Sequence, residues 1–103
     1  MIVRIVKLHI QHQFIDQFIK QFKESKDRIK SSRGNRLLEL YQDTSDPTVF
    51  FTYSYWETAE DLEFYRQSEF FKHLWRQTKR WFSDKPMAWS VNKLVSLSNN
   101  KLV

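Results

Sequence analysis

Apolar residues recur along this chain with two different spacings, which predict an alternation of strands and helices. Residues 2–10 and 49–56 carry dense runs of β-branched, aliphatic and aromatic residues, which are typical of strands inside a sheet. Residues 36–42 and 87–94 carry shorter strand patterns. The turn-forming residues of segment 43–47 predict that the second and third strands form a hairpin.

A long helix with one buried side is expected over residues 13–31. Its apolar residues fall within one arc when placed at about 100° per residue, and its charged residues lie outside that arc. Gly34, just after this segment, favours the left-handed turn that ends many helices. The arc contains Phe14, Ile15, Phe18, Ile19, Phe22 and Ile29.

Two further helices are expected after the third strand, with almost no connecting residues between them. Thr58, followed three residues later by Asp61, is an N-cap signal for a short helix. Ser68 is a second N-cap signal, and the helix after it is expected over 69–82. The inward side of the short helix is expected to carry Ala59, Leu62 and Tyr65.

The order β-α-β-β-α-α-β predicts an α+β, ferredoxin-like domain with a four-stranded antiparallel sheet and its helices on one face. The first strand is apolar on both sides, with Val6 on one parity and Val3 on the other. The sheet face away from the helices therefore needs a cover, and we expect a homodimer in which two sheets pack face to face. The domain is expected over residues 1–95, followed by a loose tail over 96–103.

Composition narrows the possible functions. The chain of 103 residues has one glycine and no cysteine, which excludes glycine-rich phosphate loops, disulfides and thiolate metal sites. The net charge of +5 is modest and fits an ordinary solvated surface. No apolar run reaches the ~18 residues of a membrane span, so we expect a cytoplasmic protein with no membrane partner.

The histidines and carboxylates do not form a recognisable motif for metal binding or acid–base catalysis. His9, His12 and His73 are scattered without paired spacing, so no metal site is expected. His73 lies outside the apolar side of its helix and is expected on the surface, whereas His9 shares the strand face assigned to the dimer. The carboxylates lie in turns and at helix starts, where they favour capping roles.

A set of motifs in the second half of the chain resembles one known family. Together with the predicted element order, these motifs resemble the antibiotic biosynthesis monooxygenase (ABM) family, and the similarity runs from Met1 to about Leu94. The resemblance implies a dimeric α/β barrel of ferredoxin-like subunits. Known members include cofactor-free oxygenases of anthrones and quinols, haem-degrading enzymes and proteins without an established activity. The motifs are Tyr55-Trp56-Glu57-Thr58, Leu62, Tyr65, Ser68 and Phe71-Lys72.

The haem-degrading branch of that family differs from this chain at its functional positions. That branch uses an Asn on the first strand, a Trp in the short helix and a His in the last helix as haem ligand. The matching residues here are Val6, Tyr65 and Trp75. The indole nitrogen of Trp75 only donates hydrogen bonds and cannot ligate iron. Haem degradation by that route is therefore not expected, and no cofactor is expected.

The resemblance to the quinol and anthrone branch implies oxygenation by dioxygen without a metal or flavin. Tyr65 occupies a position that faces the pocket in that branch, and its ordinary pKa of about 10 favours a hydrogen-bond donor over a general base. Arg4 shares a strand face with Val6 and is the candidate to stabilise a phenolate. A core tyrosine and a solvent-reaching arginine are the plainer interpretations of these two catalytic candidates. The candidate pocket residues are Val6, Leu62, Phe71 and Trp75.

Two other functions stay open at this point. The first is a non-catalytic dimer that binds an aromatic metabolite. The second is binding of single-stranded nucleic acid, because RNA-recognition domains share a similar element order and stack bases on aromatic strands. The chain lacks the glycine-containing motif of those domains, and its Lys and Arg residues cluster on the helices. We therefore expect a small aromatic substrate, dioxygen and a second copy as partners, and no nucleic acid.

Overall fold

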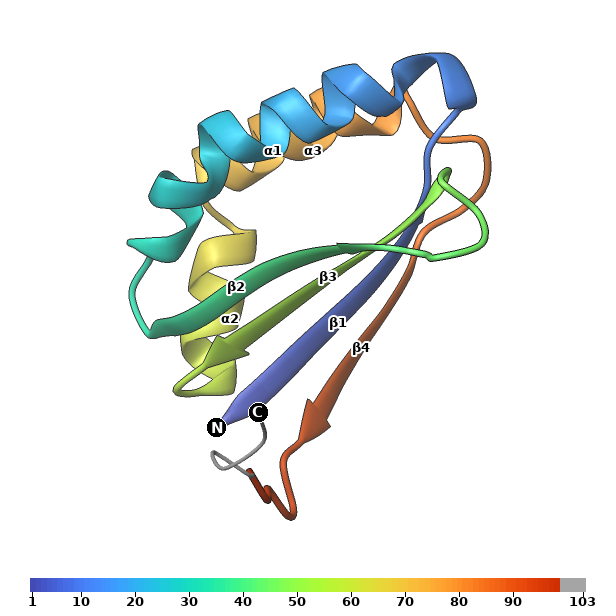
Figure 1. Ribbon diagram of the computed structural model, residues 1–103. Coiled ribbons are helices and arrows are strands. Elements are labelled where there is room, and N and C mark those ends of the chain that lie inside the picture. Colours follow the sequence, from blue (N-terminus) through green and yellow to red (C-terminus); the bar gives the residue numbers. More distant parts are fainter. Residues whose placement is uncertain (99–103) are drawn as a thin grey trace.

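A computed structural model describes residues 1–98 of the protein and shows one four-stranded antiparallel sheet (Figure 1). Its strands lie in the order β2-β3-β1-β4, with β1 and β3 in the centre. This order, with helices following β1 and β3, is the ferredoxin-like α+β arrangement and confirms the predicted fold class. The strands are β1 (Ile2–His9), β2 (Asn35–Gln42), β3 (Val49–Trp56) and β4 (Met87–Asn92).

All the helices lie on one face of the sheet, as predicted. Figure 1 shows α1 and α3 side by side above that face and α2 across one end of it. A short 3₁₀ turn precedes α1. The helical elements are η1 (His12–Phe14), α1 (Ile15–Lys30), α2 (Ala59–Arg66) and α3 (Glu69–Lys79).

The strand register decides which residues face the helices. Val6 pairs with Thr52 of β3 and with Ala88 of β4, and residues paired across an antiparallel ladder point to the same face. Arg4 pairs with Ser54 and therefore shares this face. The third strand thus turns its small residues Thr52 and Ser54 toward the helices, together with Phe50 and Trp56.

The buried core lies between the sheet and α1, at the end of β1 that is distant from Arg4. Phe18 of α1 meets Phe50 of β3 with ring centroids 4.8 Å apart, and both side chains are buried. Leu8 and Ile10 complete this cluster from the central strand. Burial of such side chains contributes about 1.5–3 kcal/mol each, so the cluster anchors α1 to the sheet. Partly buried side chains around it are Val6, Phe14, Ile15, Ile19, Leu40, Trp75, Trp81 and Phe82.

The last helix is shorter than the predicted 69–82, because residues beyond Lys79 pair with the first strand instead. Gln11 donates its backbone N–H to the carbonyl of Trp81 at 2.7 Å, and Ser83 donates to the carbonyl of His9 at 2.9 Å. This bridge draws Trp81 out of the helix and still leaves its ring against the core. Ala59 was expected on the inward side of the short helix; that prediction is wrong, since Ala59 is exposed.

The sheet face away from the helices is apolar, and several of its large side chains are exposed in the single chain. Trp89 is 41% exposed and Tyr41 is 49% exposed. Tyr53 contacts Tyr41 and Tyr55, with ring centroids 6.2 and 5.4 Å apart, so three tyrosines run across β2 and β3. This surface, which we call the open face, is where the predicted twofold partner would pack. The open face comprises Val3, Ile5, Lys7, His9, Leu37, Glu39, Tyr41, Phe51, Tyr53, Tyr55, Met87, Trp89 and Val91.

The segment after β4 leaves the sheet. It stays near one end of the open face, where Lys93 lies 4.1 Å over the Tyr55 ring and residues 93–97 line a groove with Val3, Ile5 and Tyr53. Leu94 and Leu97 are almost fully exposed. The predicted loose tail covers 96–103, and its residues from 99 onward lie outside the described part of the chain. None of the helices in residues 1–98 is long and apolar enough to cross a membrane.

Candidate functional site

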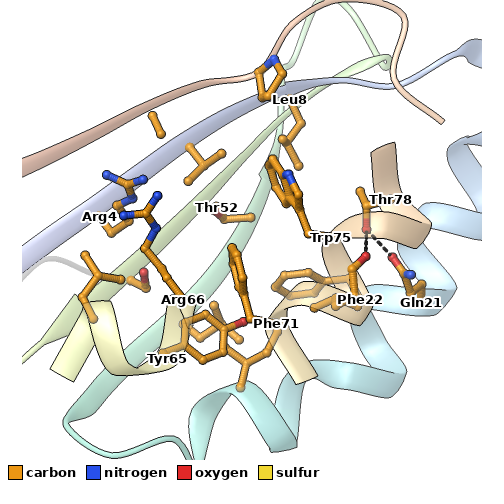
Figure 2. A pocket seen from close by; sticks show the side chains of 18 of the residues that line it. Arg4, Leu8, Gln21, Phe22, Thr52, Tyr65, Arg66, Phe71, Trp75 and Thr78 are labelled. Carbon is orange, nitrogen blue, oxygen red and sulfur yellow. Dashed lines mark hydrogen bonds between the residues drawn. The ribbon is translucent and has the colours of Figure 1, made fainter. Parts of the chain in front are cut away.

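A cavity of about 320 Å³ lies between the helix-facing side of the sheet and the helices (Figure 2). Ligand pockets in proteins range from about 300 to 1,000 Å³, so this one suits a small molecule of one to three rings. Most of its wall is apolar. The lining residues are Arg4, Val6, Leu8, Phe18, Gln21, Phe22, Ile29, Leu38, Thr52, Ser54, Trp56, Leu62, Tyr65, Arg66, Phe71, Leu74, Trp75, Thr78, Pro86 and Ala88.

All six candidate residues chosen from the sequence line this one cavity. They come from β1, α2 and α3, so the tertiary fold brings together side chains that are up to 71 positions apart. The structure establishes the positions of these residues, and their roles stay predictions. The residues are Arg4, Val6, Leu62, Tyr65, Phe71 and Trp75.

The cavity exists because small side chains form its floor. Val6, Thr52, Ser54 and Ala88 lie on neighbouring strands of the helix-facing side. Large residues at these positions would fill the space under α3, as Phe50 and Phe18 do further along the sheet. The alternation of β3 therefore places its bulky Phe51, Tyr53 and Tyr55 outside and leaves a hollow within.

Aromatic rings form one wall of the cavity as a continuous series from the sheet to the last helix. Trp56 stacks on Tyr65, Tyr65 meets Phe71 edge-on, and Phe71 stacks on Trp75, with centroid distances of 5.0, 5.1 and 5.9 Å. Offset and edge-to-face pairs of this kind add about 0.5–1.5 kcal/mol each beyond their burial. These ring contacts therefore join β3, α2 and α3 into one aromatic wall. Trp89, in contrast, lies on the open face.

A helix cap fixes the turn at the centre of this wall. The Ser68 hydroxyl accepts a hydrogen bond from the N–H of Phe71 at 3.1 Å and donates one to the carbonyl of Tyr65 at 2.6 Å. One side chain thus joins the end of α2 to the start of α3. The Thr58 hydroxyl caps α2 in the same way by accepting from the N–H of Asp61 at 3.0 Å. Both predicted N-caps are confirmed.

Tyr65 is largely buried, and its hydroxyl forms no hydrogen bond with any residue from 1 to 98. The plainer interpretation of a core tyrosine with a bonded hydroxyl is therefore not what the described chain shows. Burial raises the pKa of Tyr65 above its ordinary value, because the phenolate would lose hydration there. Tyr65 accordingly stays protonated and offers a donor at the cavity wall.

Arg4 enters the cavity from the central strand. Its Nη1 donates a hydrogen bond to the hydroxyl of Ser90 on β4 at 3.0 Å. Burial lowers the pKa of the Arg4 guanidinium, repulsion from Arg66 lowers it further, and Glu63 acts in the opposite direction. An arginine stays charged near neutral pH despite such shifts. The cavity therefore contains a fixed positive charge held by a neutral partner.

Five polar residues of the cavity were not anticipated from the sequence, namely Gln21, Thr52, Ser54, Arg66 and Thr78. Arg66 is the last residue of α2, and its positive charge repels that of Arg4. Thr52 and Ser54 form part of the cavity floor. Thr78 is buried on α3, with its hydroxyl 2.8 Å from the carbonyl of Leu74 and 3.0 Å from Oε1 of Gln21. The side of β3 that faces the helices identifies Thr52 and Ser54 as cavity residues, but the sequence alone does not show which side that is. No local signal marks Arg66.

The structure offers no cluster of His, Asp and Glu within residues 1–98 that could hold a metal ion. His73 is exposed, as predicted, and His12 is exposed as well. His9 lies on the open face, in register with Val49. Outside the cavity, the carboxylate of Asp61 forms an ion pair with Arg33 at 2.9 Å. This agrees with the structural role expected for the carboxylates.

Comparison with known proteins places these features in context. Residues 1–77 match the family model described as antibiotic biosynthesis monooxygenase (ABM). No curated protein sequence matches the chain.

Solved structures share the fold at low sequence identity. One, described as an antibiotic biosynthesis monooxygenase, has a TM-score of 0.85 and 17% identity, over 92% of this chain and 100% of the other. A candidate antibiotic biosynthesis monooxygenase from Nitrosomonas europaea has a TM-score of 0.83 and 21% identity, over 92% of this chain and 100% of the other. A conserved protein from Methanosarcina mazei Go1 has a TM-score of 0.84 and 16% identity, over 90% of this chain and 93% of the other. At these identities the likeness concerns the fold.

Proposed function

Because the chain belongs to the antibiotic biosynthesis monooxygenase family, we propose that it oxygenates a small phenol, quinol or anthrone-like compound with dioxygen. The substrate would occupy the cavity between the sheet and the helices. The observation that carries the proposal is the unpaired Tyr65 hydroxyl and the Arg4 guanidinium in the wall of a mostly apolar cavity. A few polar groups in an apolar pocket are what orient a small aromatic ligand.

The proposed reaction requires no group beyond the substrate and dioxygen. The substrate releases a proton to solvent and its anion transfers one electron to dioxygen; a proton returns from solvent when the peroxide forms. The resulting radical and superoxide combine at a ring carbon, and the protonated hydroperoxide loses water to leave a carbonyl. Two hydrogens and one oxygen atom leave as water, and the second oxygen atom remains in the product.

Each candidate residue has a role in that reaction. Tyr65 donates a hydrogen bond to the substrate oxygen, because its raised pKa keeps the proton in place. Arg4 stabilises the substrate anion and so favours its formation inside an apolar site. Val6 on the cavity floor and Leu62 on the short helix limit the space for the substrate ring. Phe71 and Trp75 form the wall on which this ring stacks. Together these contacts keep water away from the reacting carbon.

Oxygen uptake tests the proposal directly. A panel of hydroquinones, naphthols and anthrone is added to the protein in the presence of catalase and a metal chelator, and uptake is compared with the uncatalysed rate. We expect uptake above that rate with at least one compound, and a reduction of about tenfold or more in Tyr65→Phe and Arg4→Gln. Absence of uptake across the panel would contradict turnover and favour the non-catalytic binder of an aromatic metabolite.

We also propose that the open face joins two copies of the chain into a homodimer. Support comes from its aromatic surface, in which Trp89 and Tyr41 are 41% and 49% exposed in the single chain. Single-stranded nucleic acid would need this same surface, since Lys7 and Lys93 lie over Phe51 and Tyr55 at 5.9 and 4.1 Å. Filter binding at low salt distinguishes the two occupants, and we expect no retention of a mixed oligonucleotide pool.

A further inference from the structure

Two arginines from different elements meet at one end of the cavity. Arg4 comes from β1 and Arg66 from the last turn of α2, and Figure 2 shows their guanidinium groups next to each other. The repulsion between them is strong enough to be one of the main influences on the pKa of Arg4. Holding two like charges together costs free energy, unless an anion is bound between them.

The charges on this end of the cavity are only partly balanced. Arg66 pairs with Glu63 of the same helix at 3.2 Å, and this pair is exposed. Arg4 has the neutral Ser90 hydroxyl as its hydrogen-bond partner and forms no ion pair with any residue from 1 to 98. The surrounding groups therefore leave about one net positive charge, directed at the cavity.

The two ends of the cavity differ in accessibility. The Arg66 side chain is 44% exposed, whereas Thr78 and Phe18 at the far end are buried. The arginines thus lie at the mouth and the apolar rings lie inside. The floor between them follows β1 from Arg4 to Leu8, a span of about 13 Å at about 3.3 Å per residue. A molecule with two fused rings and one short acidic substituent fits that length.

We infer that the cavity selects an aromatic acid, whose carboxylate binds between Arg4 and Arg66 while its rings lie against Phe71 and Trp75. The inference rests on the proposed function in taking this cavity as the substrate site. It adds that the substrate carries a permanent negative charge, which neutral quinols and anthrones lack. Guanidinium groups bind carboxylates through paired, charge-assisted hydrogen bonds, which gives this end both affinity and orientation.

Binding of 2-naphthoate and its neutral counterpart 2-naphthamide tests the inference, since the two probes differ in charge and hardly in shape. We expect calorimetry to give at least a tenfold lower Kd for the acid, a preference that weakens with added salt. Arg4→Gln and Arg66→Gln should each remove most of this preference by raising the Kd of the acid far more than that of the amide, and thermal unfolding checks that the variants are folded. Arg76→Gln, an exposed arginine on α3, is the matched control and should keep the preference.

Several results would overturn the inference. Equal affinity for acid and amide contradicts it, as does a preference that persists in both arginine variants. Failure of both probes to bind also contradicts it, because the cavity must accept a two-ring acid. These outcomes are separate from oxygen uptake. Selective binding without uptake leaves the inference standing and removes the oxygenase, whereas uptake with neutral substrates and no acid preference does the reverse.

Discussion

The indole of Trp56 stacks on the phenol ring of Tyr65, with ring centroids 5.0 Å apart and planes inclined by 27°. Trp56 is the last residue of β3 and is buried, and its Nε1 donates a hydrogen bond to the Ser54 hydroxyl at 3.0 Å. This stack ties the end of a central strand to the last turn of α2. The position of Tyr65 in the cavity wall therefore depends on the sheet as much as on its own helix.

Tyr65 should make stability fall with pH in the alkaline range. Burial raises its pKa in the folded protein above the value of 10.0 expected after unfolding, so the unfolded chain releases this proton first. Below pH 10 both states hold the proton and Tyr65 contributes nothing to the pH dependence. Above pH 10 the free energy of unfolding should decline by up to about 1.4 kcal/mol per pH unit from this group alone.

Urea unfolding between pH 9 and pH 11.5 measures that effect. The Tyr65→Phe variant keeps the ring and removes the proton, so its curve should lack this part of the decline. Parallel curves for the two proteins would contradict the buried, protonated state assigned to Tyr65.

Gly34→Ala should destabilise the protein by about 2 kcal/mol. Gly34 has a φ of +78°, which residues with a Cβ rarely adopt, and an added Cβ would collide with the Asp61 carboxylate. Asp61 would have to move, and its 2.9 Å ion pair with Arg33 would be lost. Denaturant midpoints measure the effect. Arg33→Gln is the control that removes only the ion pair, and it should cost less than 1 kcal/mol. Equal losses in the two variants would leave the backbone argument without support.

Thr52→Ile should stabilise the fold and weaken ligand binding. The Thr52 hydroxyl has no hydrogen-bond partner among residues 1–98, and the longer β-branched side chain would extend into the cavity. Filling that space should add about 0.5–1 kcal/mol to the free energy of unfolding. The matched control is Thr52→Val, which removes the hydroxyl without adding volume. Thermal unfolding and titration with 2-naphthoate give the two readouts, and unchanged affinity in Thr52→Ile would show that the ligand binds elsewhere.

Tyr53→Lys should convert the proposed homodimer into a monomer. Tyr53 lies in the middle of the open face between Tyr41 and Tyr55, where a lysine would bring a charge into a sheet-to-sheet interface. Phe64→Lys is the matched control, because Phe64 is 60% exposed on α2 and away from the sheet. Light scattering should report twice the chain mass for the unmodified protein and for Phe64→Lys. A monomer in the unmodified protein would contradict the dimer itself.

Local patterns in the sequence determined the elements and their ends wherever one side chain acts on nearby backbone. Thr58 and Ser68 are examples, because an N-cap needs only the next three residues to form its hydrogen bond. The apolar arc of the first helix is another, since Phe18 and Ile29 are buried as the 3.6-residue period requires. From these features the fold class followed, and the family resemblance supplied six candidates that the structure places around one cavity.

Tertiary structure alone decided what those candidates can do. Both parities of 49–56 are apolar enough to be buried, so only pairing with β1 shows that Thr52 and Ser54 face the helices. Pairing of Ser83 with His9 ends the last helix before Trp81, although its apolar period continues. The meeting of Arg4 with Arg66 joins positions 62 residues apart. No local pattern encodes such a meeting, because it depends on how the whole sheet registers against α2.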